Sequence, residues 1–127
     1  MSNKRIEHPV AGRSLKIHEW QINAVCGNTV AAYLLAYFEA MHNVDMQLAS
    51  KSKSSDHDPA MEWKFHSIYN LIKATLGTGN EKSVRKAIDM LKNLGFISIE
   101  NNQRRKYEEK LRLNIETINL WIESNWI

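Results

Sequence analysis

The sequence predicts an α+β fold that is mainly helical, with a core of three helices, a two-stranded β-hairpin and a C-terminal helix. Three patterns lead to this class. Residues 28–41 are apolar almost all the way round a helix, and residues 66–76 and 79–94 place apolar side chains at helical spacing. Residues 96–100 and 110–115 alternate with the period of two that half-buried strands show. Helix-rich segments therefore precede a hairpin.

The chain has 127 residues, which fits one domain at 14–127 behind a flexible arm at 1–13. The arm lacks the apolar stretch of a secretory signal, no run approaches the roughly 20 apolar residues of a membrane span, and Cys26 is the only cysteine. We therefore expect a cytoplasmic protein. Residues 43–62 are polar and rich in serine and aspartate, which predicts a mobile loop inside the domain.

The remaining elements follow from local signals. The pattern at 14–17 is compatible with a short strand, and that at 18–25 with a short helix or a turn that ends at Gly27. Asn28 or Thr29 can cap the central helix. Thr78-Gly79-Asn80-Glu81 has the S/T-x-x-E form of a capping box, so the third long helix is predicted to begin there and to end at Gly95.

Positive charge is concentrated in one segment. The net charge is only +3, but residues 78–112 hold nine lysines and arginines against five acidic residues. The apolar stripe of the helix at 79–94 leaves most of its basic side chains on the other faces, and Arg104-Arg105-Lys106 lies at the tip of the predicted hairpin. A helix with basic side chains next to a basic hairpin tip suits a polyanion that carries phosphates on two strands.

A helix, a glycine-containing turn, a second helix and a hairpin is the order of a winged helix-turn-helix. The stretch Asn80 to Ile97 resembles the S-x-x-T-V-R-x-x-I-x-x-L-x-x-x-G-x-I line of winged-helix proteins. Residues 30–38, followed by a polar gap and Trp63-Lys64-Phe65, are similar to winged-helix domains of phage and plasmid replication proteins. The resemblance covers about residues 16–120, and it implies a domain that binds origin or promoter DNA, often as a dimer.

These patterns predict a sequence-specific protein for double-stranded DNA, acting in replication initiation or transcription regulation of a mobile genetic element. The helix from Asn80 is expected to enter the major groove, while the hairpin tip reaches the adjacent backbone or minor groove. The predicted DNA-binding residues are Lys64, Thr78, Asn80, Lys82, Ser83, Arg85, Lys86, Lys92, Arg104, Arg105 and Lys106. The alternative is a winged-helix protein interaction module, an adaptor or an inhibitor, that binds no DNA.

No catalytic, metal or cofactor site is predicted. Asp56-His57-Asp58, with His66 nearby, lacks the paired ligand spacing of zinc sites, and Cys26 beside an apolar helix is typical of core packing. The sequence has no phosphate-cradling glycine loop and no G-x-S-x-G motif. We therefore expect no enzyme, no cofactor and no small-molecule substrate.

The last segment predicts a partner surface. A helix that opens at Glu116-Thr117 places apolar residues on roughly one face and ends in Trp126-Ile127. A second copy of the chain could cover that surface, so a homodimer is expected. The predicted interface residues are Ile118, Trp121, Ile122 and Trp126.

Overall fold

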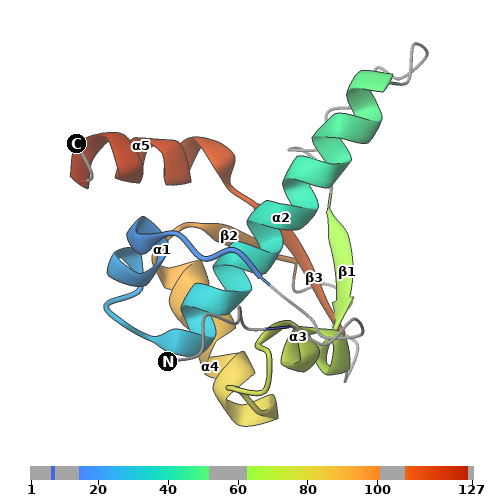
Figure 1. The fold of residues 1–127 in the computed structure, drawn as a ribbon, viewed down its shortest axis with the longest axis vertical. Coiled ribbons are helices and arrows are strands. Elements are labelled where there is room, and N and C mark those ends of the chain that lie inside the picture. The colour runs from blue at the N-terminus through green and yellow to red at the C-terminus, as the bar shows by residue number, and fades with distance from the viewer. Residues whose placement is uncertain (1–6, 8–14, 52–62, 101–107, 126–127) are drawn as a thin grey trace.

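Five helices and three strands make up the fold in the computed structural model, which describes residues 7, 15–51, 63–100 and 108–125 (Figure 1). In chain order these are α1 (Glu19–Ala24), α2 (Thr29–Lys51), β1 (Lys64–Ser67), α3 (Ile68–Ala74), α4 (Glu81–Asn93), β2 (Ile97–Ile99), β3 (Glu108–Leu113) and α5 (Ile115–Asn125). The fold is α+β and mainly helical, as the sequence predicted. The proposed arm at 1–13 falls outside the described residues except for Glu7.

The core lies where α2, α3 and α4 pack against one another. The proximal half of α2 supplies buried Leu34, Leu35 and Phe38, as its apolar circumference requires. From the other side, α4 contributes Ile88 and Leu91, both almost fully buried. The inward residues of the sheet and Ile118 of α5 complete one continuous apolar cluster.

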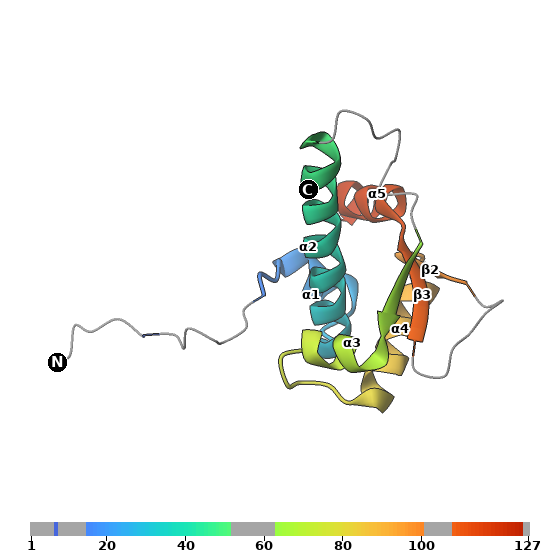
Figure 2. The ribbon, with the colours of Figure 1, turned by 90° about the vertical axis from the view of Figure 1, so that its right-hand side faces the viewer.

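The sheet has three antiparallel strands in the order β1-β3-β2, whereas the sequence predicted two. The predicted hairpin is present, with Ile97 paired to Leu113. The additional strand is β1, in which Lys64 pairs with Leu111 and Ser67 with Glu108. His66 and Ser67, expected in a helix from 66 to 76, therefore belong to a strand. Figure 2 shows this sheet standing beside α2.

The central helix is longer than predicted, because α2 continues to Lys51. The first half of the predicted loop at 43–62 is therefore helical, and residues 52–62 fall outside the described residues. Extending an existing helix costs much less than nucleating one, and Met46, Gln47 and Leu48 are good helix formers. The distal turns of α2 project beyond the sheet (Figure 1).

The segment before α2 forms a helix but no strand. Residues 15–18 have no regular structure, and α1 follows as expected at 18–25. Gln21 is fully buried and donates its side-chain amide to the Glu39 carboxylate at 2.5 Å, which ties α1 to α2. Satisfying a buried polar group in this way avoids its desolvation cost.

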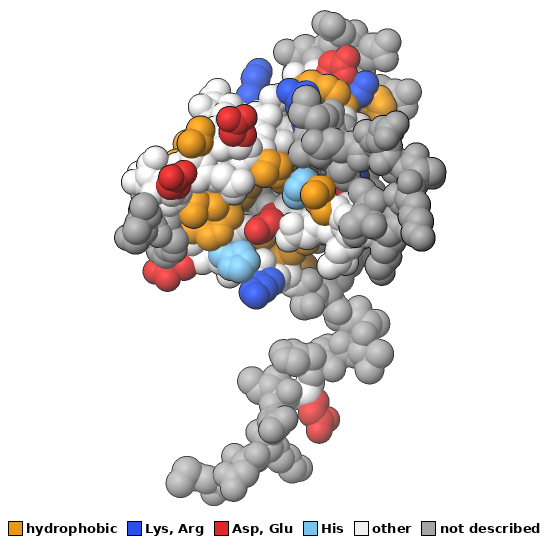
Figure 3. All heavy atoms as spheres, turned by 90° about the horizontal axis from the view of Figure 1, so that it is seen from above, with side chains coloured by type: hydrophobic (Ala, Val, Ile, Leu, Met, Phe, Trp, Pro, Cys, Tyr) orange, Lys and Arg blue, Asp and Glu red, His pale blue; other side chains and the backbone are white. Residues whose placement is uncertain are grey.

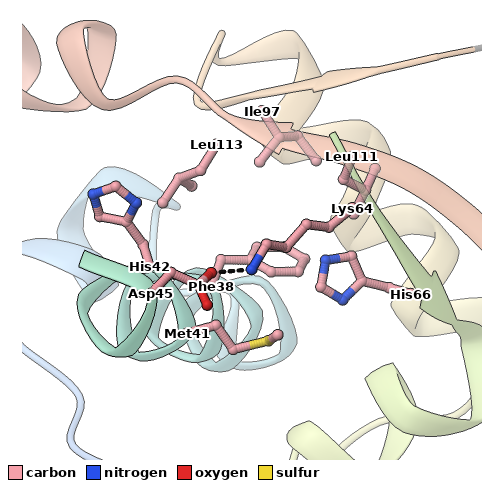
Figure 4. A pocket seen from close by; sticks show the side chains of 9 residues that line it. All are labelled: Phe38, Met41, His42, Asp45, Lys64, His66, Ile97, Leu111 and Leu113. Atoms are coloured by element: carbon pink, nitrogen blue, oxygen red, sulfur yellow. Dashed lines mark hydrogen bonds and ion pairs between the residues drawn. The ribbon is translucent and has the colours of Figure 1, made fainter. Parts of the chain in front are cut away.

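His66 of β1 is a buried titratable residue whose side chain faces α2 (Figure 4). Its ring centroid lies 5.2 Å from that of Phe38, in an edge-to-face arrangement. Burial in this apolar setting, and then the nearby charge of Lys64, lower the pKa of His66 from 6.5 to about 4. Figure 4 shows His66 and Lys64 on the same side of β1, facing α2, with Asp45 pairing with the Lys64 ammonium. His66 is therefore neutral in the folded protein near pH 7.

This pKa makes stability depend on pH in one direction. Because the unfolded chain binds the His66 proton near pH 6.5 and the folded chain only near pH 4, the contribution of neutral His66 is complete above pH 6.5. It is lost as the pH falls from 6.5 towards 4, by at most about 3 kcal/mol. Urea unfolding measures the free energy of unfolding of the wild type and of His66→Phe. The difference between these two free energies should change by this amount as the pH falls from 6.5 towards 4. A difference that is constant with pH would contradict the assignment.

Candidate nucleic-acid interface

The connection between α3 and α4 is held by the hydroxyl of Thr75. Thr75 is fully buried, donates its hydroxyl to the Ile72 carbonyl at 2.6 Å and accepts the Gly79 amide at 3.0 Å. A Cβ on Gly79 would lie only 3.1 Å from that hydroxyl oxygen, so a side chain fits poorly here. Gly77 adopts a φ of +86°, a left-handed conformation that glycine takes without strain. The turn therefore fixes where α4 begins.

Asn80, rather than Thr78, caps α4. The Asn80 side-chain oxygen accepts the Ser83 amide at 2.9 Å, and the Ser83 hydroxyl accepts the Asn80 amide at 2.8 Å. Thr78 instead donates its hydroxyl to the Thr75 carbonyl at 2.7 Å. The predicted capping box is therefore wrong by two residues, because the turn already uses Thr78. Two predicted DNA contacts, Asn80 and Ser83, also spend part of their hydrogen-bonding capacity on the cap.

The two sides of α4 differ sharply in chemistry. A buried stripe faces α2 and α3, and it consists of Val84, Ala87, Ile88 and Leu91. At 100° per residue, the direction opposite this stripe carries Lys82, Lys86, Asp89 and Asn93, which are all exposed. We call these four residues the outer ridge of α4. It holds two ammonium groups near the start of the helix and one carboxylate a turn later.

The flank of α4 carries the other predicted cations. Arg85 is half-buried and pairs with Glu81 at 3.2 Å, one turn earlier, while Lys92 is exposed. An exposed pair of this kind contributes little to stability, but it does reduce the positive potential around Arg85. Among the described residues, the cations of this helix that form no ion pair are therefore the lysines at positions 82, 86 and 92.

No described residue among the remaining predicted DNA contacts lies on the surface of α4. Lys64 points to the inner side of β1, where its ammonium pairs with Asp45 of α2 (Figure 4). Its direction follows from strand alternation, since Lys64 and His66 share one side of β1. Lys64 as a DNA contact is therefore unsupported by its position. Arg104, Arg105 and Lys106 fall outside the described residues.

Sequence reasoning missed Tyr69, which is exposed, and the half-buried Lys73 of α3. Tyr69 is exposed, and the Lys73 ammonium lies 4.1 Å from the centre of its ring. Both occupy the side of α3 opposite buried Ile68 and Leu71. The spacing of the apolar residues of α3 already places these two side chains on its outer side, by the same helical periodicity that identified the basic side of α4. The helices α3 and α4 lie together at one end of the molecule in both ribbon views (Figures 1 and 2).

The predicted dimer residues of α5 lie largely against their own chain. Ile118 is only 7% exposed. Trp121 lies beside Trp20 and Phe96, with ring centroids 6.3 Å away in each case, and Ile122 packs on the same core. Trp126 falls outside the described residues. The described apolar side chain that α5 leaves open is instead Leu120.

The described residues provide no metal centre, since they contain no group of three or more histidine, cysteine or acidic side chains able to hold an ion. Asp56, His57 and Asp58 fall outside the described residues. In the same described portion, no helix combines the length and apolarity that crossing a bilayer requires.

Comparison with known proteins assigns no relative. No family model matches the chain, and no curated protein and no solved structure matches it either. The function must therefore be argued from the geometry of the chain itself.

The cap of α4 gives a stability prediction. Asn80→Ala removes the acceptor for the Ser83 amide and should lower the free energy of unfolding by about 1 kcal/mol. Asn80→Asp keeps an acceptor at the same place and should stay close to the wild type. Urea midpoints measure both changes. If Thr78→Ala costs more stability than Asn80→Ala, the cap has been assigned to the wrong residue.

Proposed function

We propose that this chain is a winged helix-turn-helix protein that binds duplex DNA with α4 as the recognition helix. The order of elements supports this proposal: α2, β1, α3, α4 and then the β2–β3 hairpin, with β3 between β1 and β2 in the sheet. In such folds the second helix of the α3–α4 pair enters the major groove and the hairpin is the wing. The three-stranded sheet favours this assignment, because β1 anchors the wing to the helices.

The observation that carries the proposal is the outer ridge of α4. A helix fits the width of the major groove only if one side is free of its own protein. The α4 stripe is buried while Lys82, Lys86 and Asn93 are exposed, so that condition is met. Ammonium groups at positions 82 and 86 can bind phosphates or base edges, and Lys92 can bind a flanking phosphate. The side-chain amide nitrogen of Asn80 retains its donors for the same groove.

We infer a role at specific sites of a mobile element, in replication initiation or transcription regulation. The resemblance around Asn80 to Ile97 and at 30–38 motivates this step, and selection of bound sequences from random duplexes tests it. A repeated enriched half-site would support an origin or operator binder. An adaptor or inhibitor that binds only protein would give no enrichment and no salt-dependent retention of duplex.

We further propose that the active form is a homodimer that contacts its partner through the distal turns of α2 and through α5. Val44 and Leu48 are 54% and 61% exposed, and Met46 and Leu120 are exposed as well. Figure 3 looks onto this end of the molecule and shows apolar side chains there between scattered charges. The end lies opposite α3 and α4 (Figure 1), so a partner copy and a DNA duplex would not compete. Two-fold symmetry would then match paired half-sites.

Removing the two ridge lysines tests DNA binding. Lys82→Ala combined with Lys86→Ala should weaken duplex binding and reduce the log–log salt slope by about 1.8, since each phosphate contact contributes about 0.9. Fluorescence anisotropy with a labelled duplex at several salt concentrations measures both quantities. Lys16→Ala is the matched control, because Lys16 is an exposed lysine remote in sequence from α3 and α4. A slope that is unchanged in the double variant would refute the assignment of these residues.

The single carboxylate of the ridge should act in the opposite direction. Asp89 repels phosphates that approach Lys86, so Asp89→Asn should tighten duplex binding by roughly fivefold at low salt, or about 1 kcal/mol. Screening should remove most of this gain at high salt. The same anisotropy assay measures it. Weaker binding by Asp89→Asn on every duplex tested would show that this side of α4 does not face DNA.

The dimer proposal has its own readout. Light scattering of the wild type at micromolar concentration should give twice the mass of one chain, and Val44→Glu with Leu48→Glu should give the mass of one chain. Leu76→Glu places one such charge on an exposed leucine at the α3–α4 end and should leave the dimer intact. A wild type with the mass of one chain would rule the homodimer out.

A further inference from the structure

The outer face of the sheet carries an ordered arrangement of aromatic and cationic side chains. Strand alternation turns Leu111 and Leu113 towards the helices, so Lys110 and Arg112 point to the opposite side. Phe65 lies directly across from Lys110, and Ser98 directly across from Arg112. Trp63, one residue before β1, continues the same register opposite Arg112. Each of these two rows on the outer face therefore begins with an aromatic ring at β1 and has a cation of β3 at its centre.

The contacts within these rows are close. The Arg112 guanidinium lies 4.8 Å from the centre of the Trp63 ring, and the Lys110 ammonium lies 5.2 Å from the centre of the Phe65 ring. Lys110 also pairs with Glu100 at 2.8 Å. Phe65 is nevertheless 49% exposed. Cross-strand cation–π pairs stabilise a sheet modestly, but they do not require a large ring to stay half in water.

We propose that this outer sheet face binds single-stranded nucleic acid. Unpaired bases would stack on Phe65, Trp63 and the plane of the Arg112 guanidinium, and backbone phosphates would contact Lys110 and Arg112. Every base has a π-face, so such a surface tolerates many sequences. A duplex keeps its bases stacked on one another and cannot use these rings. The site uses no residue of the α4 ridge, and it goes beyond the duplex-binding function proposed above.

The charges on this face favour a nucleic acid over a protein ligand. Within the described part of the chain no carboxylate pairs with Arg112, and the one acidic side chain of the two rows, Glu100, is already engaged by Lys110. The Arg112 guanidinium beside the Trp63 ring, with no carboxylate paired to it in the described residues, matches a polyanion whose bases are flat. An uncharged peptide would use the rings but would leave the Arg112 guanidinium without an anionic partner.

The test uses the full chain and a labelled 12-nucleotide oligothymidylate, which forms no duplex with itself. Fluorescence anisotropy should show binding by the wild type. Phe65→Leu keeps apolar bulk but removes the ring, and it should weaken binding of the oligonucleotide by roughly tenfold. Phe65→Tyr keeps the ring and should bind within about twofold of the wild type. Arg112→Gln should weaken binding and lower the salt slope by about 0.7.

Two controls separate this site from the α4 ridge. Lys82→Ala with Lys86→Ala should leave oligothymidylate binding within about twofold of the wild type, while Phe65→Leu should leave duplex binding equally unaffected. Circular dichroism and urea unfolding show whether each variant folds. The proposal is overturned if the wild type does not bind the oligonucleotide, if a folded Phe65→Leu binds it as well as Phe65→Tyr does, or if the α4 variant loses it to the same extent. Each of these outcomes can occur with duplex binding intact.

Discussion

The burial of one stripe of α4 against α2 and α3 is the constraint on which the rest depends. Fully burying a side chain such as Ile88 or Leu91 stabilises the fold by roughly 1.5–3 kcal/mol. Rotating α4 by one residue would expose these groups and bury an unpaired lysine, which costs several kcal/mol more. The direction of Lys82 and Lys86 is therefore set by residues that are buried in the core. Apolar substitutions within the stripe should therefore change both the stability of the fold and the direction in which Lys82 and Lys86 point.

Both ends of α4 are held by side chains that satisfy backbone groups. At the start, the Thr75 hydroxyl accepts the Gly79 amide at 3.0 Å, and a larger residue at 79 would press on it. At the end, Gly95 takes a φ of +81°, and the side-chain amide of Asn114 donates to the Gly95 carbonyl at 2.8 Å. Asn114 follows β3 directly, so this bond links the hairpin to the end of α4. The helix and the hairpin are thus joined by a hydrogen bond at this point.

Local chemistry predicted the elements whose partners are near in sequence. The hairpin and the buried face of α4 each show their own period, and the structure contains both. The strand β1 was missed because its four residues gain their pairing from β3, more than forty positions away, and carry a weak local signal. The direction of Lys64 was missed with it, since no side of a strand can be assigned before the strand itself. The cap was misplaced because Thr78 and Asn80 are both good candidates, and the hydrogen bonds of Thr75 with Thr78 and Gly79 inside the turn decide between them.

Pairing of charges within the chain explains how a protein of net charge +3 can still present localised positive surfaces. Asp45, Glu81 and Glu100 each pair with a cation of their own domain, and these pairs hold α2 to β1, lie within one helix, or join β2 to β3. The acids are thereby placed beside Lys64, Arg85 and Lys110, whereas Lys82, Lys86 and Lys92 remain exposed to solvent. Because screening limits charge interactions to about 10 Å at ordinary salt, a phosphate responds to this local set and hardly to the net charge. The distribution of acids therefore supports the outer ridge of α4, which includes one carboxylate, Asp89, as the proposed position for a duplex.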